Sequence, residues 1–150
     1  MYRERKIYSR PNIAIFIDGP NLLRKEFAID LREVKKRAGK YGRVIIAKVF
    51  LNQFAPEKLI EAIINEGFES VISLAKGEEE ETDIDVSLAI AAMEAVFTKN
   101  IDTLAIATRD ADFLPLIQKA KEYGKQVIVF GSEPGFSSSL QNAADYVEML

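Results

Sequence analysis

The chain has 150 residues, of which 48% are hydrophobic and 29% are charged, with a formal net charge of −3. These values are ordinary for a soluble globular protein and predict one domain over residues 1–150, with residues 1–11 as a basic N-terminal arm. The absence of cysteine and histidine excludes disulfides, a thiol nucleophile and histidine-based catalysis or metal binding. No apolar run approaches the roughly 20 residues that span a bilayer, and no signal-peptide core is visible, so we expect a cytoplasmic protein without membrane contact.

Charge is unevenly distributed along the chain. Residues 1–50 contain 13 Lys and Arg against 5 Asp and Glu, whereas residues 51–150 contain 7 against 18. This separation is typical of a protein in which one surface attracts a polyanion and another binds metal. It is equally typical of a charged helix face with solvated loops, and we expect the glutamates at 78–81 to form such a loop.

The first predicted element is a strand at residues 13–17, five consecutive apolar residues that end at Asp18. A Gly-Pro turn and Asn21 follow, and helices and strands then alternate along the chain. We expect helices at 21–39 with an interruption near 28–30, at 56–65, 82–98, 113–123 and 137–144, and further strands at 43–51, 68–74, 103–108, 125–131 and 145–150.

This alternation predicts an α/β fold with a mainly parallel central sheet and helices on both of its faces. If the first three strands build outward and the chain then returns, the fourth strand lies beside the first, in the order 3-2-1-4-5. That order places Asp18 beside Asp110 at a topological switch point, where open α/β sheets bind their ligands.

Four acidic residues are expected at this edge of the sheet: Asp18, Asp85, Asp110 and Asp112. Clustered carboxylates repel one another unless a cation neutralises them, and Mg²⁺ or Mn²⁺ accepts such oxygen ligands. Divalent ions support phosphodiester hydrolysis by activating water and by stabilising the charge of the transition state. The pattern therefore predicts a shared metal site.

Each of these polar residues also has a structural interpretation. Thr82 to Asp85 resembles a capping box, Asp112 and Asn21 suit helix N-caps, and Asp110 suits a turn. Neighbouring residues are candidates for substrate binding, although capping and surface roles remain open for them: Asn21, Arg24, Lys25, Thr108 and Arg109. A second basic cluster would hold a nucleic-acid backbone by charge: Lys35, Lys36, Arg37, Lys40 and Arg43.

Three segments, residues 15–22, 82–86 and 107–116, resemble the NYN domain of the PIN-like ribonucleases in its LabA-like branch. The order of Asp-Gly-x-Asn and Asp-x-Asp-Phe-x-Pro-Leu carries the resemblance, which covers about residues 12–148. It implies a Rossmann-like, PIN-like three-layer sandwich and Mg²⁺- or Mn²⁺-dependent RNA cleavage. Carried over to this chain, the acidic site consists of Asp18, Asp85, Asp110 and Asp112, with Asn21 beside it.

Two positions depart from the family pattern. Many relatives carry a further acid where Ala91 stands, and a Ser-Gly pair where this chain has Thr108-Arg109. We therefore keep two hypotheses: a metal-dependent ribonuclease, and a non-catalytic RNA-binding or protein-interaction module on the same fold. Whether the chain forms a homodimer is left open. Phosphatase chemistry of the haloacid-dehalogenase type ranks low because Pro20 stands where its second Asp is needed, and no Gly-x-Gly-x-x-Gly follows the first strand for a dinucleotide.

Overall fold

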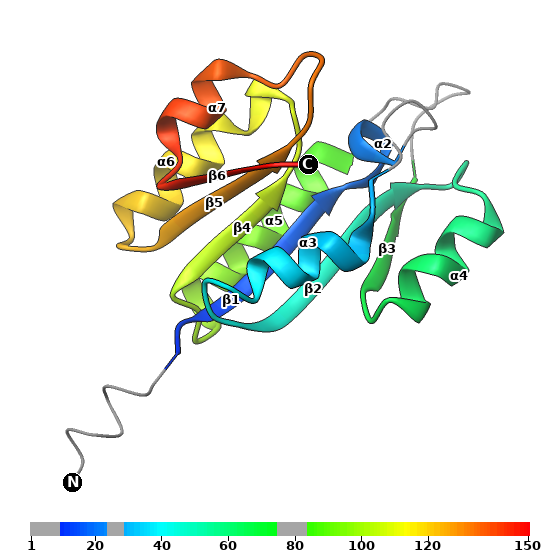
Figure 1. The fold of residues 1–150 in the computed structure, drawn as a ribbon, viewed down its shortest axis with the longest axis horizontal. Helices are drawn as coiled ribbons and strands as arrows, with labels where there is room; N and C mark the ends of the chain where they lie inside the picture. The colour runs from blue at the N-terminus through cyan, green and yellow to red at the C-terminus, as the bar shows by residue number, and fades with distance from the viewer. Residues whose placement is uncertain (1–9, 24–28, 75–83) are drawn as a thin grey trace, which may run out of the picture.

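The structure, a computed structural model, describes residues 10–23, 29–74 and 84–150, and within them six parallel strands form one sheet in the order β3-β2-β1-β4-β5-β6 (Figure 1). The strands are β1 (Asn12–Asp18), β2 (Arg43–Asn52), β3 (Glu69–Ser73), β4 (Thr103–Ala107), β5 (Gln126–Gly131) and β6 (Tyr146–Met149). The helices are α2 (Gly19–Leu22), α3 (Leu31–Ala38), α4 (Glu57–Asn65), α5 (Ile84–Thr98), α6 (Leu114–Glu122) and α7 (Ser138–Ala143), with a 3₁₀ turn η1 (Ala111–Phe113). The predicted α/β class and strand order are confirmed, and the final edge strand follows β5.

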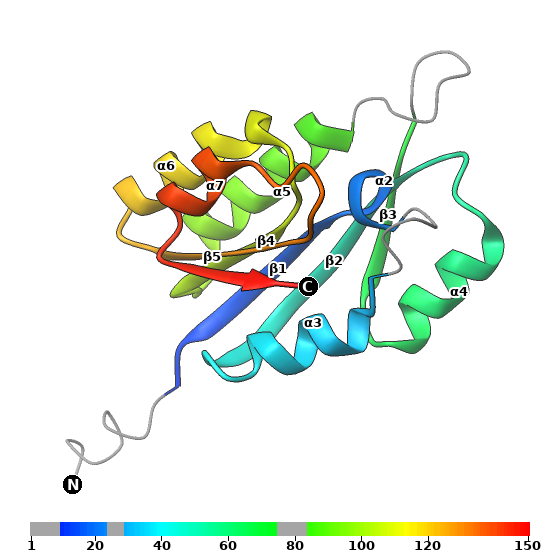
Figure 2. The same cartoon turned by 45° about the horizontal axis from the view of Figure 1, so that its top comes forward.

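β1 lies in the middle of the sheet, and the apolar residues of this strand are fully buried. Its side chains alternate between two hydrophobic clusters, one on each face of the sheet. α5, α6 and α7 cover one face, whereas α2, α3 and α4 cover the other, as Figure 2 shows for most of these helices. A strand buried on both faces is a nearly continuous apolar run, and β1 has this pattern.

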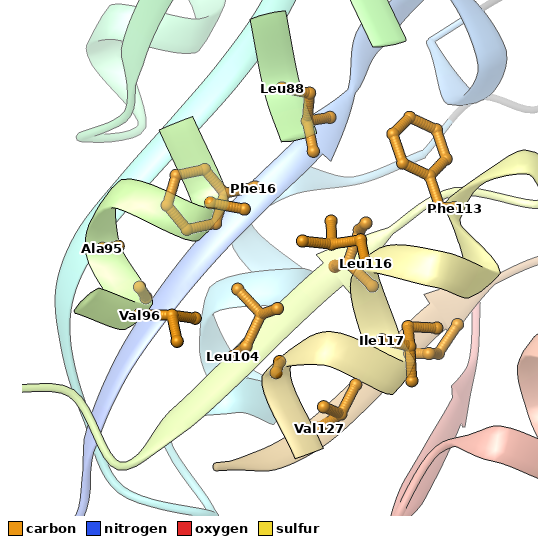
Figure 3. Close-up of a cluster of buried hydrophobic side chains, with 14 of the residues drawn as sticks. Phe16, Leu88, Ala95, Val96, Leu104, Phe113, Leu116, Ile117 and Val127 are labelled. Atoms are coloured by element: carbon orange, nitrogen blue, oxygen red, sulfur yellow. The ribbon is translucent and has the colours of Figure 1, made fainter. Parts of the chain in front are cut away.

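The first of these clusters lies between the sheet and the pair α5 and α6 (Figure 3). Leu88, Ala95 and Val96 extend from α5 toward the sheet, and Leu116 and Ile117 extend from α6. This packing fixes the position of α5, whose first turn carries Asp85 at the carboxyl edge of the sheet.

The pairing of β1 with β4 brings distant segments together at that edge. Ile13 lies opposite Thr103, and the register continues to Ile17 opposite Ala107. Because both strands run in the same direction, Asp18 and the residues that follow Ala107 leave the sheet side by side. This is the switch point that the strand order predicts.

Two predicted helix caps are wrong. Asp18 caps α2 by accepting a hydrogen bond from the Asn21 backbone N–H, so Asn21 lies inside that helix and does not cap it. Asp110, rather than Asp112, caps η1, because the backbone N–H of Asp112 donates to Asp110 Oδ1 at 2.9 Å. In both places the cap is the acid that stands earlier in the chain, and its carboxylate accepts from a backbone N–H of the first turn.

The predicted helix at 21–39 is divided into α2 and α3, and Asp30 caps α3 by accepting from the Arg32 backbone N–H at 2.9 Å. The predicted capping box at Thr82 and Asp83 and the glutamates at 78–81 lie outside the described residues. Within the described ranges, no helix combines the length and apolar content that a membrane crossing requires.

Candidate metal centre

Three of the four predicted acids gather at the carboxyl edge of the sheet. Asp85, Asp110 and Asp112 each offer a carboxylate oxygen, and these oxygens lie within 4.8 Å of one another. Asp85 comes from the first turn of α5, and the other two come from the turn that follows β4. Asp85 and Asp110 are half-buried, and Asp112 is exposed, so the cluster is open to solvent on one side.

Asp18 lies beside this cluster and is not a member of the three-oxygen group. It is only 3% exposed, and the pKa of its carboxyl is raised from 3.8 to about 7, chiefly by burial. The negative charges of Asp85 and Asp110 also contribute to this rise in pKa, whereas hydrogen bonds from Thr108 and from the Asn21 backbone oppose it. The effect of both charges on Asp18 indicates that Asp18, Asp85 and Asp110 share one electrostatic environment.

Thr108 connects the two strand ends that carry the acids. Its side chain is fully buried, and Oγ1 donates to Asp18 Oδ2 at 2.9 Å. The same oxygen accepts a hydrogen bond from the Asp110 backbone N–H at 3.2 Å. Thr108, predicted as a substrate-binding residue, therefore uses its hydroxyl to hold two carboxylate-bearing residues in position.

Asn21 and Arg109 form a second connection on the rim of the cluster. Asn21 Oδ1 accepts hydrogen bonds from the Arg109 backbone N–H at 3.0 Å and from Arg109 Nε at 3.2 Å. Arg109 Nη2 donates to the Asn21 carbonyl at 3.4 Å, and Nη1 donates to the carbonyl of Pro134. The guanidinium thus joins α2 to the loop that follows β5.

Pro134 was not predicted to take part in the site. The segment Ser132-Glu133-Pro134-Gly135, directly after the buried strand β5, lies at the same carboxyl edge as the acids, and its Pro-Gly sequence was the available signal. The predicted substrate-binding residues Arg24 and Lys25 lie outside the described residues.

The second basic cluster, on and after α3, bonds largely to the protein itself. Lys35 Nζ donates to the carbonyls of Glu66 and Gly67 at 3.3 and 3.2 Å. Arg37 forms ion pairs with Glu33 at 3.0 Å and Glu148 at 3.7 Å. These cations contribute to the electrostatic potential of the surface, but part of their hydrogen-bonding capacity is used inside the fold.

The donor set fits a hard divalent cation. Carboxylate oxygens are the ligands that Mg²⁺ and Mn²⁺ prefer, and each ion usually takes one or two carboxylates and keeps several waters. Three carboxylates this close repel one another, and a bound cation would remove that repulsion. Ala91, the position at which the family resemblance implies a further acid, is half-buried and packs against the core cluster.

Comparison with known proteins places these residues in a family. The model of the NYN domain matches residues 12–150. The chain is 55% identical over 145 residues to the uncharacterized protein MJ0482 of Methanocaldococcus jannaschii, and the match covers 97% of this chain and 58% of that protein. The chain therefore spans little more than half the length of this curated relative.

A solved structure has the same fold. The crystal structure of VPA0982, a protein of unknown function from Vibrio parahaemolyticus, superimposes with a TM-score of 0.82 at 21% identity and covers 95% of this chain and 94% of that chain. The predicted PIN-like fold is confirmed, whereas the LabA-like branch stays a prediction. With a family match over residues 12–150, the chain belongs to the NYN-domain family of the PIN-like nuclease superfamily.

Proposed function

We propose that this chain is a metal-dependent ribonuclease that hydrolyses the phosphodiester bonds of RNA. The observation that supports the proposal most directly is the cluster of Asp85, Asp110 and Asp112 oxygens within 4.8 Å, in a chain with an NYN domain. We further propose Mg²⁺ or Mn²⁺ as the ion, cytoplasmic RNA as the substrate, and the LabA-like branch as the nearest group within the family.

Asp85, Asp110 and Asp112 would hold the ion directly or through water, and Asp18 would complete the site from its buried position. The bound ion would neutralise the carboxylates, lower the pKa of a water and stabilise the negative charge that develops on the phosphate. The hydrogen bonds of the Thr108 hydroxyl fix the positions of Asp18 and Asp110 relative to each other. The carboxylates would therefore need little rearrangement when a cation binds.

Substrate would approach the open side of the cluster, next to the rim that Asn21 and Arg109 form. Asn21 would position a phosphate or ribose group there, and Arg109 would keep the α2 turn in place and present positive charge at the rim. We propose Arg24 and Lys25 as further backbone contacts, since they follow Asn21 closely in the sequence.

Cleavage of labelled RNA, both single-stranded and structured, in the presence of Mn²⁺ tests this function. We expect Asp110→Asn and Asp85→Asn to lose activity by at least about a hundredfold. Substitution of residues that only hydrogen-bond to metal ligands already lowers metal affinity or activity by up to about a hundredfold. Glu122→Gln, an exposed acid on α6, is the matched control and should retain wild-type activity. Equal activity in all four proteins would exclude the proposed site.

A second candidate function is RNA binding or protein interaction without catalysis. Ala91 in place of an acid, and the use of the Arg109 guanidinium in hydrogen bonds to Asn21 and Pro134, favour this alternative. It predicts RNA binding that weakens as salt rises, with no turnover in Mg²⁺ or Mn²⁺. RNA turnover that is lost in Asp110→Asn would support the ribonuclease, whereas RNA binding without turnover would support the second function.

A further inference from the structure

The outer face of α5 is apolar although it is exposed. Val86, Ile90 and Phe97 are 66%, 65% and 57% exposed, and Met93, which follows Ile90 along the same side, is half-buried and also packs against the core cluster. The opposite face of the helix packs into the core, as Leu88, Ala95 and Val96 show in Figure 3. Asp85 and Glu94 are the charged residues of α5, so the helix is apolar on nearly all sides. A helix with this pattern is normally buried on every side.

The four outer residues form one stripe along the helix. Their positions, 86, 90, 93 and 97, are separated by four, three and four residues, which is the spacing of a seam between two packed helices. We call Val86, Ile90, Met93 and Phe97 the α5 stripe. Apolar side chains that are scattered singly over a surface need no explanation, but a contiguous stripe indicates an interaction surface.

Apolar residues from neighbouring elements extend the stripe at both ends. The Ser73 hydroxyl donates to the Ser87 hydroxyl at 2.9 Å, which places the end of β3 and the exposed Leu74 beside the first turn of α5. At the other end the ring of the exposed Tyr123 contacts the Phe97 ring edge-on, with centroids 4.6 Å apart. The surface therefore continues beyond α5 in both directions.

The stripe is complementary to a second copy of itself. In an antiparallel helix pair centred between Ala91 and Ala92, Val86 lies opposite Phe97 of the partner subunit, and Ile90 lies opposite Met93 of the partner subunit. A small side chain then faces a large one at each end. The same symmetry sets Glu94 opposite Ala89 of the partner subunit, so the acidic residues of the two helices do not face each other.

We propose that the chain forms a two-fold symmetric homodimer in which the α5 helices pack antiparallel along the α5 stripe. Asp85 lies about 100° around the helix from Val86, so the interface leaves the acidic cluster open. Asp85 lies opposite Thr98 of the partner subunit, and because these positions are 13 apart in the sequence, the two clusters are separated by about 20 Å along the helix axis. The dimer does not depend on the proposed ribonuclease activity.

The molar mass of the full 150-residue chain, measured by sedimentation equilibrium, tests the dimer. We expect twice the 16.8 kDa of one chain. Ile90→Glu places a carboxylate against the partner's Met93 at both symmetric contacts, and it should raise the dimer dissociation constant at least about tenfold. Ile64→Glu, the same change at a 57% exposed position on α4, should leave the mass unchanged. A monomeric wild type, or a dimer that Ile90→Glu does not weaken, would overturn the proposal.

Disulfide cross-linking tests the antiparallel register, and the chain suits it because it has no native cysteine. A mixture of Val86→Cys and Phe97→Cys chains should form a cross-linked pair under oxidation, since these positions face each other. Val86→Cys alone should not, because its two copies lie about 16 Å apart along the axis, beyond the reach of a disulfide. A cross-link in Val86→Cys alone, or none in the mixture, would refute the antiparallel pairing. Circular dichroism of each variant confirms that it folds.

Discussion

The Thr108 hydroxyl donates a 2.9 Å hydrogen bond to Asp18 Oδ2, and both side chains are buried. The two residues follow neighbouring strands, so this bond joins the end of β4 to the end of β1. Because the same hydroxyl oxygen accepts from the Asp110 backbone, a change at Thr108 affects a buried acid and a member of the three-oxygen cluster together.

Thr108→Val should therefore destabilise the protein at neutral pH. Valine has nearly the same shape but no donor for Asp18 and no acceptor for the Asp110 N–H, and an unsatisfied buried polar group costs about 1–3 kcal/mol. The pKa of Asp18 should rise above about 7, because the Thr108 hydrogen bond lowers it. Urea unfolding at pH 7 measures the loss, and Thr108→Ser, which keeps the hydroxyl, is the control. Identical stability of the valine variant and the wild type would contradict this role.

Asp18→Asn should stabilise the metal-free protein in a pH-dependent way. The folded chain retains the Asp18 proton up to a pKa of about 7, whereas the unfolded chain releases it near 3.8, so stability from this group falls as pH rises between these values. The difference corresponds to at most about 4 kcal/mol, and the amide avoids this loss because it does not ionise. We expect a gain of a few kcal/mol at pH 8 and almost none at pH 4.

Chemical unfolding in EDTA at these two pH values checks the prediction. The exposed Asp112 provides the matched control, since Asp112→Asn does not remove a buried charge. A gain at pH 4 as large as the gain at pH 8 would show that the effect has another origin.

Mn²⁺ should raise the melting temperature of the wild type through the acidic cluster. A ligand at a hundredfold excess over its Kd stabilises the folded state by about 2.7 kcal/mol, which is about 5–10 °C for a chain of this size. Asp110→Asn should lose most of this shift, whereas Glu122→Gln, on the outer surface of α6, should keep it. Thermal denaturation with and without Mn²⁺ gives the comparison, and equal shifts in all three proteins would place the ion elsewhere.

Asn21 and Arg109 should be energetically coupled. Arg109→Ala removes the guanidinium donors to Asn21 and Pro134 and should cost about 1–3 kcal/mol. Arg109→Lys should not restore the loss, since a single ammonium cannot reproduce the fork geometry. In a double-mutant cycle with Asn21→Ala, we expect a coupling of about 1 kcal/mol. Additive losses would show that the two side chains act independently.

Much of the fold could be predicted because its signals are local. Full burial leaves β1 as an uninterrupted apolar run, and the alternation of strands with helices restricts the sheet order. Once that order was assumed, the meeting of Asp85, Asp110 and Asp112 at one edge followed from parallel strand direction, and the structure confirms that these three gather.

The finer arrangement of the site could not be predicted because it depends on contacts between distant residues. Asn21 and Arg109 are 88 positions apart, and their hydrogen bonds depend on the rotamers of both side chains. Asp18 rather than Asn21 caps α2 because the helix begins directly at Gly19, two residues earlier than the pattern indicated. The hydrogen bond between Thr108 and Asp18 likewise requires the register of β1 against β4.

The pairing of Ile13 with Thr103, ninety positions away, has a consequence for the order of events during synthesis of the chain. A chain that ends before β4 contains Asp18 and Asp85 but lacks Asp110 and Asp112, two of the three carboxylates of the cluster. The three-oxygen cluster would thus be complete only after more than two thirds of the described fold has been made. If the proposed function holds, truncated products of the same message would lack its metal site.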